Sequence, residues 1–423
     1  MFSFMVLSVW QWWIVTVCAV SVDDLFHGGC IIDTMKFDII VIGGGLVGAS
    51  LLAALKESGL SIALIEPHQT APLPQDSSWD SRVYAISPGS AAFLQKHGIW
   101  PLLAAERIAP VYDMAVYGDD NTAHIDFSAY EMGCSELAFI AENRQLQSAV
   151  WQVLQSCGDA IQVLCPAKCK ALTWQESCVE VELEDGRLLE AALVVGADGV
   201  NSWVRNQADI EVDRHAYHQL GVVANFSTEL SHHHVAYQWF RRDGVLALLP
   251  LPEKRVSMVW STTEIQAERL KQLSPEELCS EVREASSFTL GAMQLITPPV
   301  GFPLNFVHVK QLVKPRLVLI GDAAHGIHPL AGQGVNLGLR DARELAAVLM
   351  DRGLRTDCGD WQLLRRYELA RKEDILALEV VTDGLQKLFN NANPTLARLR
   401  NLGLEVTNRL PLIKNQLMRH ALN

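Results

Sequence analysis

A glycine-rich turn near the start of the chain narrows the choice of fold more than any other segment. The β-branched run at residues 37–42 (FDIIVI) is typical of a buried strand, and the glycines after it precede a helical pattern at residues 47–58. A second apolar run at residues 61–65 ends in Glu66, about 20 residues after the glycines. This order of strand, glycine turn, helix, strand and acid is that of a dinucleotide-binding unit, so the sequence predicts an α/β fold.

Each glycine of the turn has a distinct structural role. Gly43 allows the tight turn, Gly45 lets a pyrophosphate approach the backbone, and Gly48 lets the helix pack closely on the strand. The phosphates then lie at the positive N-terminus of the helix. A glycine triplet alone often only joins a strand to a helix, but Glu66 is placed to accept hydrogen bonds from ribose hydroxyls. We therefore interpret the segment as a nucleotide-binding unit.

A second cluster follows the strand-like run at residues 317–320. A Gly-Asp pair at its end presents the carboxylate of Asp322 beside small residues. Gly332 and Gly334 then open a helix whose N–H groups can face an electron-rich ring. We interpret this cluster as a second ligand contact, and the chain after it as mostly helical.

Residues 221–262 have a different sequence pattern. Three β-rich runs, separated by two short turns, predict a separate antiparallel sheet. The runs are residues 235–240, 245–251 and 255–261.

Composition limits the class of protein and its partners. At 423 residues the chain exceeds the usual size of one core, which predicts two closely joined domains. A net charge of −13 repels phosphate backbones, and no basic stripe alternates with aromatic residues, so no nucleic acid partner is expected. Nine cysteines at irregular spacing do not make a disulfide framework, which favours a reducing, cytoplasmic location.

No metal site is expected. Cys165 and Cys169 have no second pair at zinc-finger spacing, and His325 and His328 have no third ligand nearby. The histidine run at residues 232–234 is interpreted as a solvated loop.

Separated motifs in a fixed order now allow a comparison with a family. The chain, from about residue 36 onward, resembles the single-component, class A flavin monooxygenases of the para-hydroxybenzoate hydroxylase type, and within them the ubiquinone-biosynthesis ring hydroxylases. The residues that carry the resemblance are 43–48 (GGGLVG), 80–87 (DSRVYAIS), 196–202 (GADGVNS) with Arg205, and 321–338 (GDAAHGIHPLAGQGVNLG) followed by Arg340 and Asp341.

The resemblance implies a particular domain arrangement. The fold is expected to be α/β, with a Rossmann-like FAD-binding domain of the para-hydroxybenzoate hydroxylase type, an inserted antiparallel-sheet substrate domain and a helical C-terminus. The expected ranges are 35–110, 135–215 and 305–385 for the FAD-binding domain, 111–134 and 216–304 for the substrate domain, and 386–423 for a helical tail.

The resemblance also assigns roles to single residues. Glu66 and the first glycine motif would hold the adenosine and pyrophosphate of FAD, and Arg82 would reach the phosphates or the ribityl chain. Arg144 lies where such enzymes often have a flavin contact, with a plain helix-surface arginine as the alternative. Asp198 would lie where FAD and incoming NAD(P)H are both handled, and Asp322 would accept hydrogen bonds from the ribityl hydroxyls. The isoalloxazine ring would be lined by Pro329, Gly332, Gln333, Gly334 and Asn336.

The activity implied is hydroxylation of a polyprenylated phenol or benzoquinol in ubiquinone biosynthesis. In the mechanism that the resemblance implies, NAD(P)H would reduce the flavin, and O₂ would then give a flavin C4a-hydroperoxide that transfers oxygen to the ring. Because the cofactor carries the chemistry and the protein supplies position and dryness, no catalytic protein residue is assigned. The antiparallel sheet is expected to form the floor of the substrate pocket.

Two other functions stay open on this evidence. One is a different aromatic hydroxylase, or a related flavoprotein without oxygenase activity. The other is a non-catalytic, membrane-associated scaffold that binds FAD within a biosynthetic complex. Oxidation of NAD(P)H that a prenylated phenol stimulates would separate the first interpretation from both.

The two terminal segments need their own interpretation. Residues 1–34 contain an apolar stretch with three tryptophans and no cationic flank, and Met35 stands two residues before the first expected strand. We expect the segment to be dispensable, and a start of translation at Met35 is favoured over a membrane anchor.

Residues 396–423 carry five basic residues against the single acid Glu405, with apolar residues at mainly helical spacing. Such a tail suits peripheral docking on the inner membrane or on a partner enzyme, or packing on the body of the protein.

Overall fold

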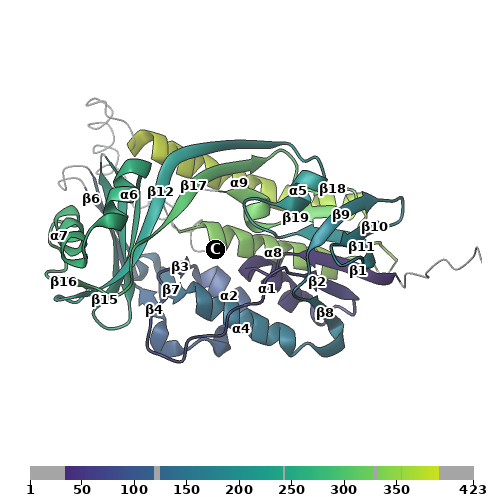
Figure 1. Ribbon diagram of the computed structural model, residues 1–423, viewed down its shortest axis with the longest axis horizontal. Coiled ribbons are helices and arrows are strands. Elements are labelled where there is room, and N and C mark those ends of the chain that lie inside the picture. Colours follow the sequence, from purple (N-terminus) through teal and green to yellow (C-terminus); the bar gives the residue numbers. More distant parts are fainter. Residues whose placement is uncertain (1–33, 119–123, 242, 327–331, 354, 390–423) are drawn as a thin grey trace, which may run out of the picture.

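The computed structural model describes residues 34–118, 124–241, 243–326, 332–353 and 355–389. The expectations for residues 1–33, for Pro329 and for the tail at 396–423 therefore lie outside the described residues. Figure 1 shows two large sheets at opposite ends of an elongated molecule, with the long strands β12 and β17 running between them.

The first sheet has eight strands and is mainly parallel. The expected strand at residues 37–42 is found as β1, which pairs in parallel with β2 on one side and with β11 on the other. The order β18-β19-β11-β1-β2-β8 places β1 in the centre, which explains why its last four residues are buried. Its strands are β1 (Met35–Ile42), β2 (Ile62–Ile65), β8 (Ile161–Leu164), β9 (Cys169–Trp174), β10 (Val179–Leu183), β11 (Leu188–Gly196), β18 (Val313–Lys314) and β19 (Leu317–Leu319).

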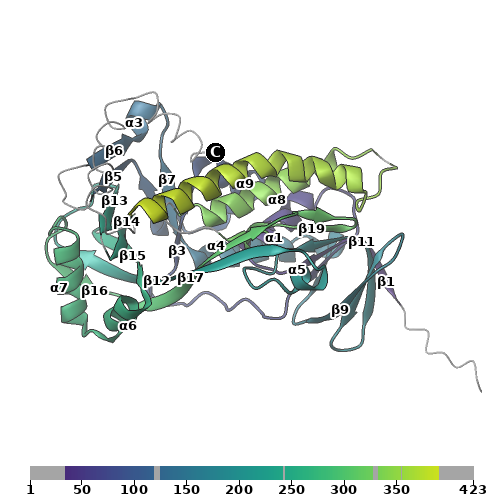
Figure 2. The ribbon, with the colours of Figure 1, turned by 90° about the horizontal axis from the view of Figure 1, so that it is seen from above.

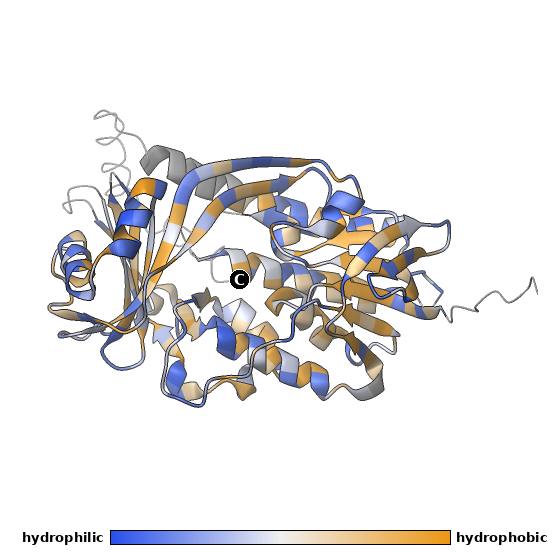
Figure 3. Cartoon of the chain, in the orientation of Figure 1, coloured by the Kyte–Doolittle hydropathy of each residue, from blue (hydrophilic) through white to orange (hydrophobic). Residues whose placement is uncertain are grey.

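Helices pack on this sheet, and α1 lies in contact with both α4 and α8. Helix α9 packs along α8, as the view from above shows (Figure 2). The central strands of this sheet are largely apolar, whereas the helices carry both apolar and polar residues (Figure 3), as expected for a sheet covered on its faces by amphipathic helices. The helices are α1 (Leu46–Leu55), α4 (Asn143–Gln155), α5 (Trp203–Gln207), α8 (Gly334–Met350) and α9 (Trp361–Phe389).

The second sheet has nine strands and contains the expected antiparallel meander. Its order is β20-β17-β12-β15-β14-β13-β5-β6, with β16 paired to β12. All its pairs are antiparallel except β13 with β5, which are parallel. Its strands are β5 (Asp113–Tyr117), β6 (His124–Ser128), β12 (Val212–Thr228), β13 (Val235–Arg241), β14 (Gly244–Leu251), β15 (Arg255–Thr263), β16 (Met293–Leu295), β17 (Val300–Val309) and β20 (His325–Gly326).

One face of the second sheet is covered by α6 (Glu264–Gln272) and α7 (Pro275–Ala285). Alternate residues of β12, such as Val222 and Phe226, pack with these helices in one buried cluster, so the residues between them face the other way. The expected domain boundaries at 215/216 and 304/305 fall inside β12 and β17.

A three-stranded sheet, β3-β7-β4, contacts both larger parts of the molecule: β3 touches α8, and β4 and β7 touch β14. The remaining elements are β3 (Val83–Ile86), β4 (Ala109–Val111), β7 (Ala138–Glu142), α2 (Pro88–Lys96), α3 (Ala129–Met132) and the 3₁₀ turns Trp100–Leu102, Ala105–Arg107, Gly158–Ala160 and Gly321–Ala323.

Among the described helices, none has the length and apolarity needed to cross a membrane.

The histidine run at 232–234 does form a turn, but the expectation of a solvated loop is wrong for His232. That ring is buried, with its Nε2 2.8 Å from the carbonyl oxygen of Leu251.

Candidate functional site

The turn between β1 and α1 is dense on one side and open on the other. Gly43 has φ of +109°, and a Cβ there would lie 2.4 Å from the carbonyl oxygen of Ala197. A Cβ at Gly48 would lie 2.2 Å from the carbonyl oxygen of Gly43. By contrast, a Cβ at Gly45 would meet no atom within 4 Å, and no side chain caps the helix that starts after it. The turn therefore leaves free space beside the uncapped N–H groups of α1, where an anion is stabilised.

Glu66 lies at the end of β2 and fixes this turn. Its carboxylate accepts hydrogen bonds from the backbone N–H of Gly44 at 2.6 Å and of His68 at 3.0 Å. The carbonyl oxygen of Gly44 in turn accepts from Gln147 Nε2 at 2.6 Å and Trp151 Nε1 at 2.9 Å, both on α4. Sequence reasoning missed Gln147 and Trp151, because nothing in the pattern of an amphipathic helix marks a side chain that reaches a distant turn.

The second cluster meets the first at Val47, in the first turn of α1. Gly321 has φ of +60°, and a Cβ there would lie 3.2 Å from Val47 Cγ1. A Cβ at Gly338, on α8, would lie 2.6 Å from Val47 Cγ2. Two glycine motifs that are far apart in the sequence therefore pack against the same side chain, which brings Asp322 close to the start of α1.

Asp322 has the surroundings of a residue in a hollow. Its side chain is accessible to solvent, yet the protein atoms around it partly desolvate the carboxyl group and raise its pKa. The positive charges of His325 and Arg82 act in the other direction and lower it. A side chain that is both accessible and surrounded by protein lines a concave surface. Asp322 is thus placed to contact a ligand rather than to pack in the core.

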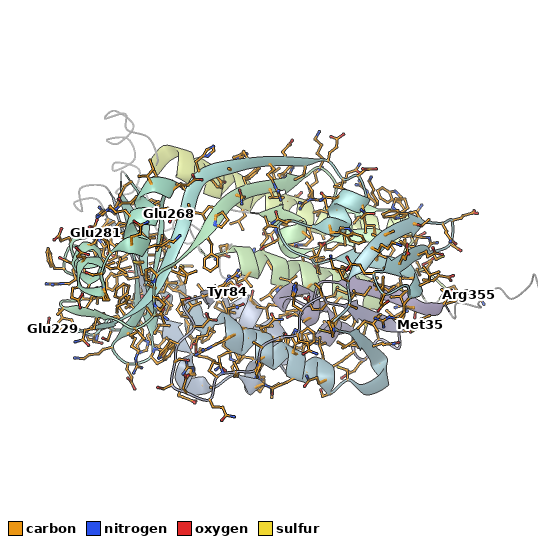
Figure 4. The ribbon with its side chains drawn as sticks, in the orientation of Figure 1. Met35, Tyr84, Glu229, Glu268, Glu281 and Arg355 are labelled. Carbon is orange, nitrogen blue, oxygen red and sulfur yellow. The ribbon has the colours of Figure 1, made fainter. Side chains whose placement is uncertain are left out.

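Arg82 precedes β3 and faces two rings. Its guanidinium carbon lies 5.3 Å from the ring centre of Tyr84 and 5.6 Å from that of Phe302, a residue of β17. Burial raises the pKa of Tyr84, and the negative charge of Asp322 adds to that rise. Figure 4 labels Tyr84 near the centre of the molecule, between the two large sheets. Arg82, Tyr84 and Asp322 therefore come together in this central region.

The N-terminus of α8 is fixed to β3 by Asn336. This buried side chain accepts from the backbone N–H of Ser87 at 2.9 Å and donates to the carbonyl oxygen of Ala85 at 2.8 Å. Gln333 accepts from Arg340 at 3.2 Å, while a Cβ at Gly334 would meet nothing within 4 Å. Asn336 thus positions the helix start, and the open side lies at Gly334. Gly332 adopts φ of +61° in the turn before it.

Asp198 caps a short helix. Its Oδ2 accepts from the backbone N–H groups of Trp203 at 2.7 Å and Val204 at 3.0 Å, at the start of α5. Its Oδ1 is buried and has no hydrogen-bond partner within the described part of the chain. This oxygen therefore keeps an unused capacity to accept a hydrogen bond.

Arg144 belongs to a buried charge cluster that sequence reasoning did not anticipate. The carboxylate of Glu142 is buried and accepts from Arg107 at 2.6 Å and 3.0 Å, and Arg144 Nη2 lies 3.2 Å from it. Both arginines also donate to the carbonyl oxygen of Ser78, and Glu142 accepts from the backbone N–H of Asp80 at 2.6 Å. The cluster thereby anchors the segment that leads to Arg82.

The arrangement fits FAD. An open space beside uncapped N–H groups suits a pyrophosphate, the carboxylate of Glu66 suits a ribose, and the accessible Asp322 suits the hydroxyls of a ribityl chain. Groups of three or more potential metal ligands are absent from the residues that the structure describes.

Comparisons with known proteins agree with this geometry. A family model described as "FAD binding domain" matches residues 36–379. The chain is 35% identical over 388 residues to the 3-demethoxyubiquinol 3-hydroxylase of Escherichia coli, which covers 91% of this chain and 98% of that protein. It is 34% identical over 386 residues to the ubiquinone hydroxylase UbiL of Rhodospirillum rubrum, covering 91% and 89% of the two chains.

A solved structure shares the fold. The crystal structure of Pseudomonas aeruginosa PqsL in complex with 2-aminobenzoylacetate aligns with a TM-score of 0.73 at 22% identity, covering 88% of this chain and 100% of that one. This likeness confirms the expected α/β architecture with its antiparallel sheet.

Proposed function

The chain belongs to the FAD-dependent hydroxylases of ubiquinone biosynthesis, and we propose that it hydroxylates the ring of a polyprenylated phenol or benzoquinol, with NAD(P)H and O₂ as co-substrates. The observation that carries the proposal is the meeting of the Gly43–Gly48 turn and the Asp322 turn at Val47. This meeting joins an adenosine-binding unit to a ribityl-binding carboxylate, which is the arrangement that a full FAD molecule requires.

When bound, FAD supplies hydride acceptance and oxygen activation, so the protein needs no nucleophile of its own. The residues of the chain bind and orient. Glu66 and the N–H groups of α1 hold the adenosine ribose and pyrophosphate, and Asp322 orients the ribityl chain. The start of α8 at Gly334 leaves room for the flavin ring.

The face of the second sheet opposite α6 and α7 supplies an apolar surface for the substrate. Val223, Val259 and Ala247 lie side by side in register on β12, β15 and β14. They alternate with the residues that pack under α6 and α7, so they face the other side of the sheet. A prenylated ring fits such a surface, which also keeps water from the reacting atoms.

The purified protein is expected to retain FAD and to oxidise NAD(P)H faster when a short-chain prenylated phenol is added. The measurements are flavin identity after denaturation, NAD(P)H oxidation, and mass spectrometry of a product that has gained one oxygen atom. FMN in place of FAD would contradict the cofactor assignment. FAD without phenol-stimulated oxidation would favour the scaffold function, and hydroxylation of a non-prenylated phenol alone would favour another aromatic hydroxylase.

The proposal extends to location, because a prenylated substrate dissolves in the bilayer. We place the protein in the cytoplasm with peripheral contact at the inner membrane, through the basic tail at residues 396–423. Deleting this tail is expected to lower binding to anionic vesicles while the thermal unfolding temperature and the flavin content stay unchanged. Equal vesicle binding by the full and the shortened chain would remove the docking role.

A further inference from the structure

One carboxylate of α8 holds both ends of the turn that carries Asp322. Oδ2 of Asp341 accepts from the backbone N–H of Gly321 at 2.9 Å and lies 2.5 Å from Nε2 of His325. Gly321 directly precedes Asp322, and His325 lies three residues after Asp322. The path of the turn is therefore set on both sides of Asp322 by one buried group.

The other oxygen of Asp341 is held from α9. Arg371 Nε donates to Oδ1 at 2.8 Å, and Arg371 Nη1 donates to Asp374 at 2.6 Å. One helical turn earlier, the hydroxyl of Tyr367 donates to the carbonyl oxygen of Leu319, at the end of β19, at 3.2 Å. Helix α9 thus braces both the strand that leads into the turn and the carboxylate that shapes it.

The charges in this cluster keep Asp341 ionised. Burial alone raises the pKa of a carboxyl group, but the neighbouring charges of His325 and Arg371 and their hydrogen bonds hold the pKa of Asp341 below its ordinary value. Burial alone lowers the pKa of His325, but Asp341 raises it above the ordinary value. Hydrogen bonds to an ionised acceptor are shorter and stronger than those between neutral groups. The hydrogen bonds of Asp341 therefore restrict the movement of the turn that carries Asp322.

We propose that Asp341 is a positioning residue for FAD binding, which acts by holding Asp322 in the orientation that the ribityl chain requires. Asp341 has no exposed surface, and both of its oxygens bond to protein groups. Its influence on the cofactor therefore passes through the turn. The inference rests on the FAD site proposed above and adds a residue to it.

A double-mutant cycle on FAD affinity tests the proposal. The FAD dissociation constant is measured by flavin fluorescence after reversible removal of the cofactor, for the wild type, Asp322→Ala, Asp341→Asn and the double variant. Each single substitution is expected to raise the constant about tenfold. The double variant is expected to lie within about twofold of Asp322→Ala alone, because residues that act through one another are not additive.

Additive effects, near a hundredfold in the double variant, would overturn the proposal, because Asp341 would then act on stability or on another contact. An Asp322→Ala variant with wild-type affinity would overturn both the role proposed for Asp322 and this inference, while FAD binding itself would stand. If Asp341→Asn does not fold, Arg371→Lys replaces it in the same cycle, with a smaller expected rise and the same dependence on Asp322.

A matched control lies on the same helix. Arg366 pairs with Asp351 on the surface, where both side chains are more than half exposed. Arg366→Lys is expected to leave the FAD dissociation constant unchanged. A rise equal to that of Arg371→Lys would mean that any disturbance of α9 weakens FAD binding, and the specific role of Asp341 would fall.

Discussion

Gly45→Val is expected to yield a folded protein that does not retain FAD. Gly45 has φ of −64° and ψ of 174°, a conformation open to any residue, and a Cβ at this position would meet nothing within 4 Å of the protein. The substitution therefore strains neither backbone nor packing and costs roughly 1 kcal/mol at most, as a poorer N-cap residue. The new side chain fills the space in which the pyrophosphate approaches the helix. We expect at least a hundredfold loss of FAD affinity, about 2.8 kcal/mol, measured by fluorescence titration.

The neighbouring glycine supplies the control for this prediction. A Cβ at Gly48 would lie 2.2 Å from a backbone carbonyl oxygen, so Gly48→Ala should lower the stability of the protein itself. Gly45→Val should lower FAD binding while the thermal unfolding of the flavin-free protein stays close to that of the wild type. Full flavin content in Gly45→Val would mean that the pyrophosphate lies elsewhere.

The elements that sequence reasoning placed well are those fixed by local pattern. The strands expected at residues 37–42 and 61–65 appear as β1 and β2, and the run at 245–251 appears as β14, each within two residues. Period, glycine position and β-branched content all act within one segment, so they can be read without knowing the rest of the chain.

The parts that could not be predicted depend on segments that meet only after folding. The parallel pairing of β5 with β13 joins two runs that have β6 to β12 between them in the sequence, and nothing in either run specifies its partner. Likewise, Asn336 was expected to line the flavin ring, and that stays a prediction, but the motif gave no sign that its side chain bonds backbone groups of Ala85 and Ser87. A sequence motif indicates that a residue belongs to a site, but the direction of its side chain depends on distant backbone.

Glu142 illustrates the same limit most strongly, and Glu142→Ala is expected to destabilise the protein. In the sequence it resembles an ordinary acid at the start of a helix, yet its side chain is fully buried between two arginines, Arg107 and Arg144. Removing one partner of a buried ionic group leaves uncompensated charge and typically costs about 3–5 kcal/mol. Because the two arginines keep about a fifth of their side-chain surface exposed, we expect the lower part of that range, measured as the free energy of unfolding in urea.

The same substitution should also affect FAD binding, because Glu142 accepts a hydrogen bond from the backbone N–H of Asp80, two residues before Arg82. We expect weaker FAD binding in the folded fraction, with partial recovery in Glu142→Gln, which keeps an acceptor for that N–H. The matched control is Glu182→Ala, which breaks a pair with Lys170 in which 32% and 59% of the two side chains are exposed, and which should cost under about 1 kcal/mol. Equal losses of stability in Glu142→Ala and Glu182→Ala would show that burying the carboxylate between the arginines contributes nothing to the free energy of unfolding. The segment that leads to Arg82 would then be held by other contacts.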